Sequence, residues 1–476
     1  MKISCDLQKN VAAIKKILDT DDVKYKEIKA GSNKGCLIFA SDIADKEALG
    51  SLILRPLSAL KGKTDEKTLY KILLSPETDF AVNIEDAAKQ IADGHSALFI
   101  DGIEKAFVFG LKKYDKRAIA EPPTSTVIKG PREGFVESLA VNVSLMRRKL
   151  ASPDLCFKYL TVGKFSATQV AVCYIKTVAD TKLVETLTEK IRSINIDAIL
   201  DSSYISKFLG EHKTSLFKQI GNTEKPDILA AKILEGRVAI IVDGSPIALT
   251  VPYLLVEDLQ SPSDYYNSSY SATLARLIRV FAIFLSLYLP AFYVSAQLFH
   301  LQFIPLSFLL TIVNSIKGIP LSPSFEMFFT LLIFEILNEA SVRMPRYVGM
   351  VVSIVGGLVL GETAVNAGII SAPALMIIAL SGICLYTVPE LEQTFSLIRL
   401  LLLVIGGSFG AFGLIVASAI LLTYLVSFEN YSTPLLAPFS PLVIKDLKDG
   451  VYKGFMIEQS IRPLSLKNAN KRRLDK

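Results

Sequence analysis

The residues of this chain that could do chemistry are carboxylates and amides within a long apolar stretch, residues 277–428. Glu335, Asn338 and Glu339 are spaced i, i+3 and i+4, so a helix would present them on one face. Glu362 and Asn366 are four residues apart at the end of a glycine-rich segment. A carboxylate in apolar surroundings is costly, so it usually faces a bundle interior or a water path. The spacing therefore predicts polar helix faces with a functional or a structural use.

Two uses are open for these faces. In one, Glu335 or Glu339 forms a structural ion pair with Arg343, which follows them by eight and four residues. In the other, the acids line or gate a pore, because rings of Asp or Glu in a channel favour cations. The candidates for pore lining or gating are Glu335, Asn338, Glu339, Arg343, Glu362 and Asn366.

Catalytic and metal-binding patterns are absent from the sequence. His95, His212 and His300 are isolated, without a second ligand four residues on. The five cysteines are far apart and form no CxxC pair, so neither a disulfide framework nor a zinc site is indicated. No GxxxxGK[ST], HExxH or GxSxG sequence is present. We therefore predict no enzyme activity, metal or cofactor for this chain, and no nucleic-acid partner.

The apolar stretch itself predicts an all-α membrane domain in contact with lipid. Nine charged residues occur between Phe281 and Ile398, and none between Leu400 and Phe428. A bilayer core of about 30 Å requires about 20 apolar residues in a helix. We expect four to six spans, with candidates at Phe281–Phe299, Gly349–Gly361, Ile369–Val388 and Phe395–Phe428. The last candidate either forms one long span or turns back at its central glycines, and this choice decides the side of the C-terminus.

Residues 1–275 are expected to form a cytoplasmic α/β domain of two small subdomains. Met1–Asn10 lacks the apolar core of a signal peptide, which favours the cytoplasm. In the first subdomain, residues 7–30 predict a polar helix followed by the charged run Lys24–Lys29, and Ser96–Ile100 begins a hairpin that continues through Lys105–Gly110. The second subdomain is predicted to have strands at Gln169–Ile175 and Val238–Val242 and a helix at Thr181–Ser193. The expected domain boundaries are 1–118, 119–255, 256–430 and a polar, basic tail 431–476.

The segment Ala120–Phe135 (AEPPTSTVIKGPREGF) is rich in proline, glycine and charge. Composition favours a linker between the two subdomains. The alternative is a structured loop that contacts the membrane region or a neighbouring chain. The residues predicted to make that subunit contact are Gly130, Pro131, Arg132, Glu133, Gly134 and Phe135.

Several longer runs resemble the A subunits of the GerA-type nutrient germinant receptors of endospore-forming bacteria. Two runs are specific, GPREGF within Glu121–Phe135 and EGRVAIIVDG within Leu234–Pro246. The resemblance extends in order from about residue 35 to 455. Asn338 stands where that family usually has a basic residue and Lys225 where it usually has arginine, which puts the charge pairing at these two points in doubt. The other matching runs are Val162–Ile175, Ile196–Ser202, Thr223–Asp227, Asp264–Tyr266, Ser286–Tyr293, Phe334–Gly349, Ile354–Gly368 and Pro434–Asp449.

The resemblance implies a cytoplasmic α/β module attached to a membrane domain in the spore inner membrane. It implies a complex with a permease-like B subunit, which binds the nutrient, and a lipoprotein C subunit. It further implies a homo-oligomeric ring, expected to be a pentamer, that releases monovalent cations in response to the nutrient. Two alternatives stay open, a sporulation-stage paralogue of the SpoVAF type and a non-conducting scaffold or transporter subunit. A transporter is expected to show inverted repeats, and the two halves of 277–428 show none.

Overall fold

The computed structural model describes residues 1–60, 62, 65–73, 75, 77–113, 129–344, 357, 361–455 and 459–473. The chain forms two compact units. The α/β unit contains residues 1–253 together with 430–433 and 456–476, and the helical unit contains 254–429 and 434–455. The chain therefore enters the helical unit at Leu254 and returns to the α/β unit for four residues directly after its last long helix.

The first subdomain is an antiparallel five-stranded sheet in the order β1-β2-β4-β5-β3. Its strands are β1 (Val23–Ala30), β2 (Asn33–Ala40), β3 (Thr78–Ala81), β4 (Ser96–Ile100) and β5 (Ala106–Phe109). Its helices are α1 (Leu7–Ile17), α2 (Lys46–Ala48), the π-helical η1 (Leu49–Leu54), α3 (Arg55–Ser58), α4 (Glu66–Ile72) and α5 (Ile84–Ala92). The expected hairpin is confirmed, because β4 pairs with β5 from Ser96↔Phe109 onward.

The polar helix predicted within residues 7–30 is confirmed, whereas the charged run Lys24–Lys29 lies in a strand that the sequence did not predict. The helix α1 ends at Ile17, and residues 23–30 form the edge strand β1, paired with β2 along its whole length. The sequence VKYKEIKA of β1 carries three lysines, which suit the solvent-facing side of an edge strand. The pairing with β2, whose centre is buried, decides the conformation of this polar segment.

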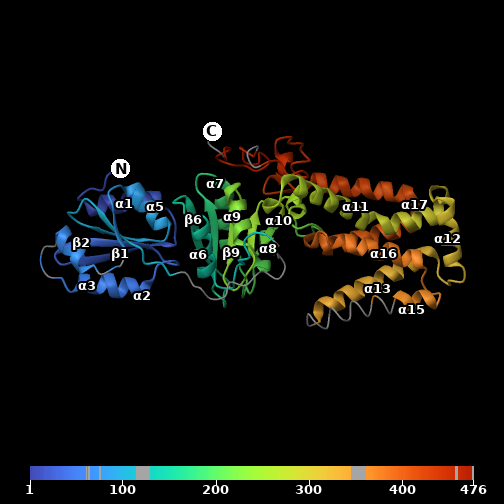
Figure 1. Ribbon diagram of the computed structural model, residues 1–476, viewed down its shortest axis with the longest axis horizontal. Helices are drawn as coiled ribbons and strands as arrows, with labels where there is room; N and C mark the ends of the chain where they lie inside the picture. The colour runs from blue at the N-terminus through green and yellow to red at the C-terminus, as the bar shows by residue number, and fades with distance from the viewer. Residues whose placement is uncertain are drawn as a thin grey trace. The chain divides into compact units, whose positions relative to one another are not determined.

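Helices cover both faces of the first sheet. One layer contains α1 and α5, which bury Ile14, Ala87 and Ile91 against the sheet. The other contains η1, α3 and α4, which bury residues such as Ile53 and Leu69. Figure 1 shows α1 and α5 on one side of this sheet and α2 and α3 on the other. Each face of the sheet therefore has its own apolar core.

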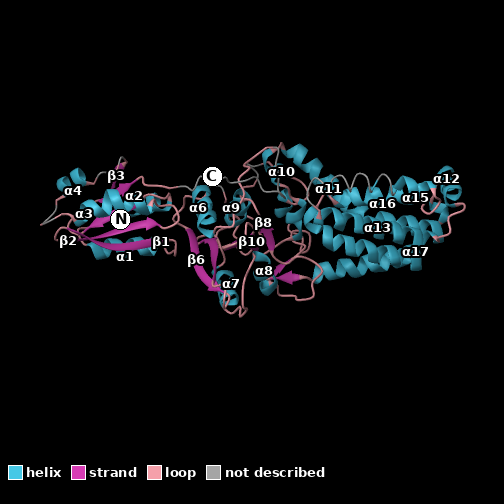
Figure 2. Ribbon diagram, turned by 90° about the horizontal axis from the view of Figure 1, so that it is seen from below, coloured by secondary structure: helices cyan, strands magenta, loops and turns pink. Residues whose placement is uncertain are grey.

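The second subdomain repeats this topology. Its sheet has the order β6-β7-β9-β10-β8, the same order as the first with each strand number raised by five. Its strands are β6 (Leu155–Val162), β7 (Thr168–Ile175), β8 (Gly221–Thr223), β9 (Val238–Val242) and β10 (Ala248–Val251). Its helices are α6 (Leu139–Lys149), α7 (Thr181–Arg192), α8 (Ser202–Leu209) and α9 (Pro226–Leu234). The strands and helix predicted here are confirmed, and Figure 2 distinguishes the two sheets in magenta from their helices.

Equivalent side chains confirm that the two subdomains are structural repeats. The Asn10 side chain accepts a hydrogen bond from the Ser4 backbone N–H (2.9 Å) and donates to the Ser4 carbonyl (2.6 Å). The Asn142 side chain does the same with the backbone of Val136 (2.9 and 2.6 Å). Both asparagines are buried in the first turns of equivalent helices, where they hold the chain segment that leads into the helix. The local sequences share the pattern Leu-x-x-Asn-Val, at Leu7–Val11 and at Leu139–Val143.

The helical unit has two helices that are long and apolar enough to cross a membrane, within the described residues. They are α11 (Ser269–Phe299) and a segment that includes α17 (Glu392–Ser427). The other helices are α10 (Pro262–Tyr266), α12 (Leu306–Ile316), α13 (Pro323–Arg343), α15 (Gly361–Asn366) and α16 (Ala372–Leu385). The 14-residue α16 is shorter than the span expected over Ile369–Val388, because Ser371 caps its start and the chain turns after Leu385. The candidate at 349–361 lies almost wholly outside the described residues.

The chain reverses direction at the central glycines of α17. Residues 392–427 comprise two helical segments joined at Gly410, whose φ of 64° and ψ of −153° are non-helical and favour glycine. After this point the chain runs back beside itself, because an added Cβ at Gly413 would lie 3.3 Å from the Ile405 carbonyl oxygen, eight residues earlier. At Gly406, an added Cβ would lie 2.8 Å from the Ala291 carbonyl oxygen of α11. Of the two alternatives for this segment, the structure therefore selects the turn at the central glycines, and Phe428 at its end lies beside Leu435, whose carbonyl accepts a hydrogen bond from Leu255 at the start of the helical unit.

We predict that residues 1–253 fold without the helical unit. The four apolar clusters of the two subdomains consist of residues from this range, apart from a peripheral contact by Tyr431. A purified 1–253 fragment should show α/β circular dichroism and a cooperative thermal transition. A fragment that stays unfolded or aggregated under several buffer conditions would contradict the prediction.

Candidate functional site

A buried arginine joins the long helices of the helical unit. Arg399 of α17 is 1% exposed, and its guanidinium donates to Glu335 of α13 and to the Ser381 hydroxyl of α16 (2.9 Å). The Ser381 hydroxyl in turn donates to the Ser286 carbonyl of α11 (2.9 Å). The ring of Phe334 lies 5.7 Å from the guanidinium carbon and covers it. One side chain therefore connects α11, α13, α16 and α17.

A second polar contact continues from the first along α13. The Asn338 amide donates to Glu392 (2.6 Å) at the start of α17, and the Tyr386 hydroxyl donates to the Asn338 amide oxygen (2.8 Å). Ser396, one turn after Glu392, donates to Glu335. Glu335 and Asn338 therefore share the inward face of α13, as their spacing predicted. We call the group Glu335, Asn338, Ser381, Tyr386, Glu392, Ser396 and Arg399 the interhelical polar network.

The sequence reasoning missed Arg399 as a member of this site. It is the last charged residue before the uncharged run that ends at Phe428. An arginine at the edge of an apolar helix was a usable signal, because such a residue is expected to have an acidic partner. The identity of that partner, 64 residues earlier in the chain, was not available from the spacing.

The remaining predicted residues lie on the surface of the helical unit. Glu339 pairs with Arg343 at 2.6 Å, so the i, i+4 ion pair considered for α13 is present, with both side chains more than half exposed. Glu362 and Asn366 are exposed on α15. An exposed ion pair contributes only about 0–1 kcal/mol to stability. The structure thus divides the predicted acids into Glu335, which is partly buried and pairs with Arg399, and two that are exposed.

Glu326 is a further buried carboxylate. It lies in the first turn of α13, and it accepts a hydrogen bond from the backbone N–H of Ser371 (2.6 Å), the N-cap of α16. The positive end of the α16 dipole faces this carboxylate and stabilises its charge. Glu326 therefore positions the start of α16 against α13.

Charged residues also cluster at the start of α11. Asp264 accepts from Arg279 (2.7 Å) and from Arg276 (3.1 Å), and Arg276 also donates to Asp449 (3.0 Å). Burial by itself would raise the pKa of Asp264, but hydrogen bonds from Arg279 and from the Ser261 backbone, with the Arg279 charge, hold it below its usual value. This cluster ties the segment that follows β12 (Thr433–Pro434) to the first turns of α11.

The loop predicted to contact another subunit packs on its own subdomain. Phe135 is buried in the core beside α6, and Glu133 pairs with Arg148 (2.5 Å). The Pro131 carbonyl accepts a hydrogen bond from the ammonium group of the buried Lys225 (2.8 Å). Arg132 is exposed, Gly130 has a positive φ of 116°, and Gly134 is buried. A contact with a neighbouring chain stays a prediction, and Arg132 is the member of this loop most accessible to one.

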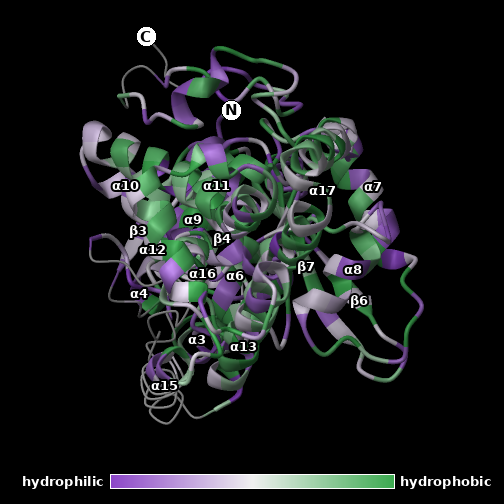
Figure 3. Ribbon diagram, turned by 90° about the vertical axis from the view of Figure 1, so that its right-hand side faces the viewer, coloured by the Kyte–Doolittle hydropathy of each residue, from purple (hydrophilic) through white to green (hydrophobic). Residues whose placement is uncertain are grey.

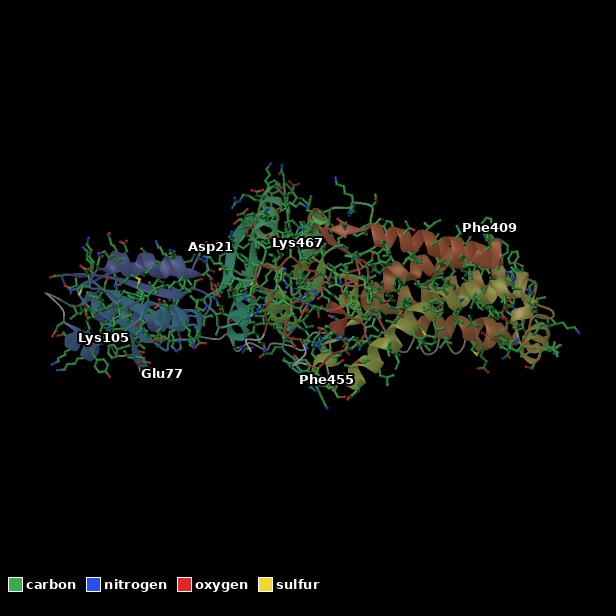
Figure 4. The ribbon with its side chains drawn as sticks, turned by 90° about the horizontal axis from the view of Figure 1, so that it is seen from above. Asp21, Glu77, Lys105, Phe409, Phe455 and Lys467 are labelled. Carbon is green, nitrogen blue, oxygen red and sulfur yellow. The ribbon has the colours of Figure 1, made fainter. Side chains whose placement is uncertain are left out.

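A buried ion pair joins the two subdomains of the α/β unit. The Arg147 guanidinium donates two hydrogen bonds of 2.9 Å to the Asp22 carboxylate, and both side chains are 1% exposed. Nearby, the Tyr159 backbone N–H donates to Asp21 (2.9 Å) and its hydroxyl donates to Asp42 (2.7 Å). Figure 4 shows Asp21 at the edge of the first subdomain that faces the second.

Burial sets the protonation at this subdomain contact. It raises the pKa of Asp42, against the lowering effect of the hydrogen bond from Tyr159. Burial and the neighbouring Asp42 raise the pKa of the Tyr159 hydroxyl far above its usual range. This hydroxyl therefore stays protonated and acts as the hydrogen-bond donor to Asp42. The Asp22–Arg147 pair and this hydrogen bond together hold the two sheets as one unit.

None of these groups forms a catalytic arrangement within the described residues. No cluster of three or more histidine, cysteine or acidic side chains able to hold a metal ion occurs in the described part of the chain. What the helical unit offers is a set of interhelical polar contacts within an apolar bundle. Such contacts can hold helices in position, and their hydrogen-bond partners can change when the helices move. The arrangement therefore suits a protein that works by changing conformation.

Comparison with known proteins identifies the family. The family model for the Bacillus/Clostridium GerA spore germination protein matches residues 12–465. Spore germination protein KA of Bacillus subtilis is 33% identical to this chain, and the match covers 100% of this chain and 89% of that protein. Spore germination protein B1 of the same organism is 30% identical, and the match covers 95% of both chains. The uncharacterized membrane protein YfkQ of B. subtilis is 33% identical over 94% of this chain and 88% of its own.

The solved structures that match include the N-terminal domain of the A subunit of the Bacillus megaterium spore germinant receptor GerK3. It is 25% identical and covers 54% of this chain and 98% of its own, at a TM-score of 0.42 that is too low to serve as evidence for the fold. The family model and the full-length relatives are sufficient by themselves. The chain belongs to the GerA family of Bacillus/Clostridium spore germination proteins.

Proposed function

We propose that this chain is the A subunit of a nutrient germinant receptor in the spore inner membrane. Its helical unit would be embedded in that membrane as part of an oligomeric, nutrient-gated cation channel. A permease-like B subunit would bind the nutrient, and a lipoprotein C subunit would complete the complex. Membership of a spore germination family supports the biological role, and the surface of the helical unit supports the membrane location.

The helical unit exposes the side chains expected to contact lipid. Phe281 and Phe284 of α11 and Phe409, Phe412 and Ile415 of α17 are all more than half exposed. Soluble proteins rarely expose contiguous apolar surface on this scale. Figure 3, coloured by hydropathy, shows α11, α16 and α17 largely in green. One relative is also named a membrane protein.

The observation that carries the channel proposal is the division of the acids. Glu335 is held by Arg399, so its charge is compensated within the subunit. Glu362 on α15 and Glu339 on α13 are exposed and can face a shared axis in a ring of identical chains. A ring of carboxylates concentrates cations and repels anions. Of the two, Glu339 already has Arg343 beside it, which makes Glu362 the stronger candidate.

We predict that Glu362→Gln lowers cation flux without weakening assembly. The substitution keeps the side-chain volume and removes the charge, so the loss of local cation concentration should lower the flux by roughly tenfold. The measurement is cation release from spores, or from liposomes that contain the complete receptor, with assembly checked by cross-linking.

The matched control is Thr363→Ala, which changes an exposed, uncharged residue beside Glu362 on α15. Its flux should match that of the unmodified receptor. Unchanged flux and unchanged ion selectivity in both Glu362→Gln and Glu339→Gln would contradict the acidic-ring mechanism. A receptor that assembles and responds to nutrient with no flux attributable to this chain would instead favour a scaffold.

A further inference from the structure

The second subdomain exposes a group of large apolar side chains that its fold does not use. Phe165 is 77% exposed, Leu200 67%, Phe208 47% and Tyr204 38%. Phe165 lies in the turn between β6 and β7, and the other three lie on or just before α8. We call these four residues, with Lys164 and Lys207, the α8 surface.

Backbone contacts bring the two parts of the α8 surface together. The backbone N–H of Phe165 donates to the Asp197 carbonyl (2.8 Å), and that of Lys164 donates to the Ile196 carbonyl (2.9 Å). The Ser166 hydroxyl accepts from the Ile199 N–H (3.1 Å), directly before Leu200. Because Tyr204 and Phe208 are spaced i, i+4, both lie on one face of α8. The turn and the helix are therefore parts of one continuous surface.

Two lysines lie beside the apolar side chains of this surface. The Lys164 ammonium lies 5.5 Å from the centre of the Phe165 ring, and Lys207 is exposed beside Phe208 on α8. Of the nearby acids, Glu211 pairs with Lys190, whereas Asp201 accepts from the neutral Ser245 hydroxyl (2.6 Å) and keeps its charge. The acid left exposed next to the turn is Asp197.

The segment that follows α17, residues 430–433, binds to the α8 end of this surface. Residues 430–433 follow α17 after two intervening residues and belong to the α/β unit. There the Tyr431 hydroxyl donates to the Leu209 carbonyl at the end of α8 (2.7 Å), and the Tyr431 N–H donates to Glu211 (2.8 Å). Burial and the Glu211 charge raise the pKa of this hydroxyl above its usual range, so it stays a donor. The segment that leaves α17 is thus bound at the C-terminal end of α8.

We propose that the α8 surface binds an anionic phospholipid membrane. Exposed aromatic and aliphatic side chains next to lysines are the combination that enters the headgroup region, with the rings below the phosphates and the ammonium groups beside them. Each lysine at an anionic surface strengthens such binding about fivefold. The proposal rests on the membrane location proposed for the helical unit, because α17 would deliver the bound segment 430–433 from the bilayer. It adds that the α/β unit itself contacts lipid.

The chain has no tryptophan, so the fluorescence of a single introduced tryptophan reports only on the position where it is placed. The experiment places Phe165→Trp in the full chain and reconstitutes it into liposomes of phosphatidylcholine and phosphatidylglycerol that contain brominated acyl chains. We expect a blue-shifted emission and strong quenching by the brominated lipid. Adding Lys164→Glu and Lys207→Glu should reduce the quenching, and so should liposomes of phosphatidylcholine alone.

Two matched tryptophans separate the possible failures. Tyr70→Trp, also on an exposed residue of the α/β unit, should not be quenched, and Phe284→Trp on α11 should be quenched strongly. Quenching of Phe284→Trp without quenching of Phe165→Trp would overturn the lipid surface and leave the membrane location intact. Loss of both signals would overturn the membrane location. A Phe165→Trp emission that is blue-shifted but unquenched would show that a second copy or another protein covers the surface, which also overturns the proposal.

Discussion

Arg399→Met is expected to destabilise the helical unit more than any other single substitution in it. Methionine keeps a long side chain of similar reach but lacks the guanidinium that compensates the Glu335 charge and donates to Ser381. Removing one partner of a buried ion pair costs about 3–5 kcal/mol, and the lower figure applies here because the Glu335 side chain is 29% exposed. The measurement is the thermal transition of the full chain in detergent, with oligomer assembly followed in parallel.

The double variant Glu335→Gln/Arg399→Met tests the cause of this loss. Without the carboxylate, no uncompensated charge remains, and most of the lost stability should return. Arg343→Met is the matched control, because its partner Glu339 is exposed and the expected change is below about 1 kcal/mol. Equal losses for Arg399→Met and Arg343→Met, or no recovery in the double variant, would show that the ion pair does not hold the helices.

Arg147→Met is expected to have the largest effect in the α/β unit. Arg147 and Asp22 are both 1% exposed, and the guanidinium also lies over the Phe157 ring at 5.2 Å. The variant leaves the Asp22 carboxylate buried between the subdomains without its cation, which should cost about 3–5 kcal/mol. Denaturant unfolding of the full chain should show a lower midpoint for the α/β transition. Amide exchange should accelerate first along the loop that precedes β1.

Lys176→Met is the matched control for this prediction. Lys176 pairs with Asp19 at 3.2 Å at the same subdomain contact, but both side chains are largely exposed. Its loss should change stability by less than about 1 kcal/mol. The double variant Asp22→Asn/Arg147→Met should recover part of the loss. If Lys176→Met and Arg147→Met were equally destabilising, the subdomain contact would depend on surface electrostatics and not on the buried pair.

The sequence alone determined those features that depend on local periodicity. Short apolar runs bounded by turn residues located β4, β5, β7 and β9, because a strand that is buried on both faces has a continuous apolar sequence. The uncharged run after Leu400 located α17, because only a helix in an apolar environment tolerates so long a segment without charge. The i, i+3 spacing correctly placed Glu335 and Asn338 on one face of α13. Each of these features depends on residues that are neighbours in the sequence.

Only the tertiary structure decided which residues meet. The i, i+4 spacing found the pair Glu339–Arg343, but Glu335 pairs with Arg399 on another helix. The partner across two helices depends on their packing register, and that register follows from close contacts such as Gly406 against Ala291. In the same way, the lysine-rich segment 23–30 becomes a strand because the buried strand β2 pairs with it along its length. Local spacing describes one element, whereas pairing between elements depends on how the whole chain packs.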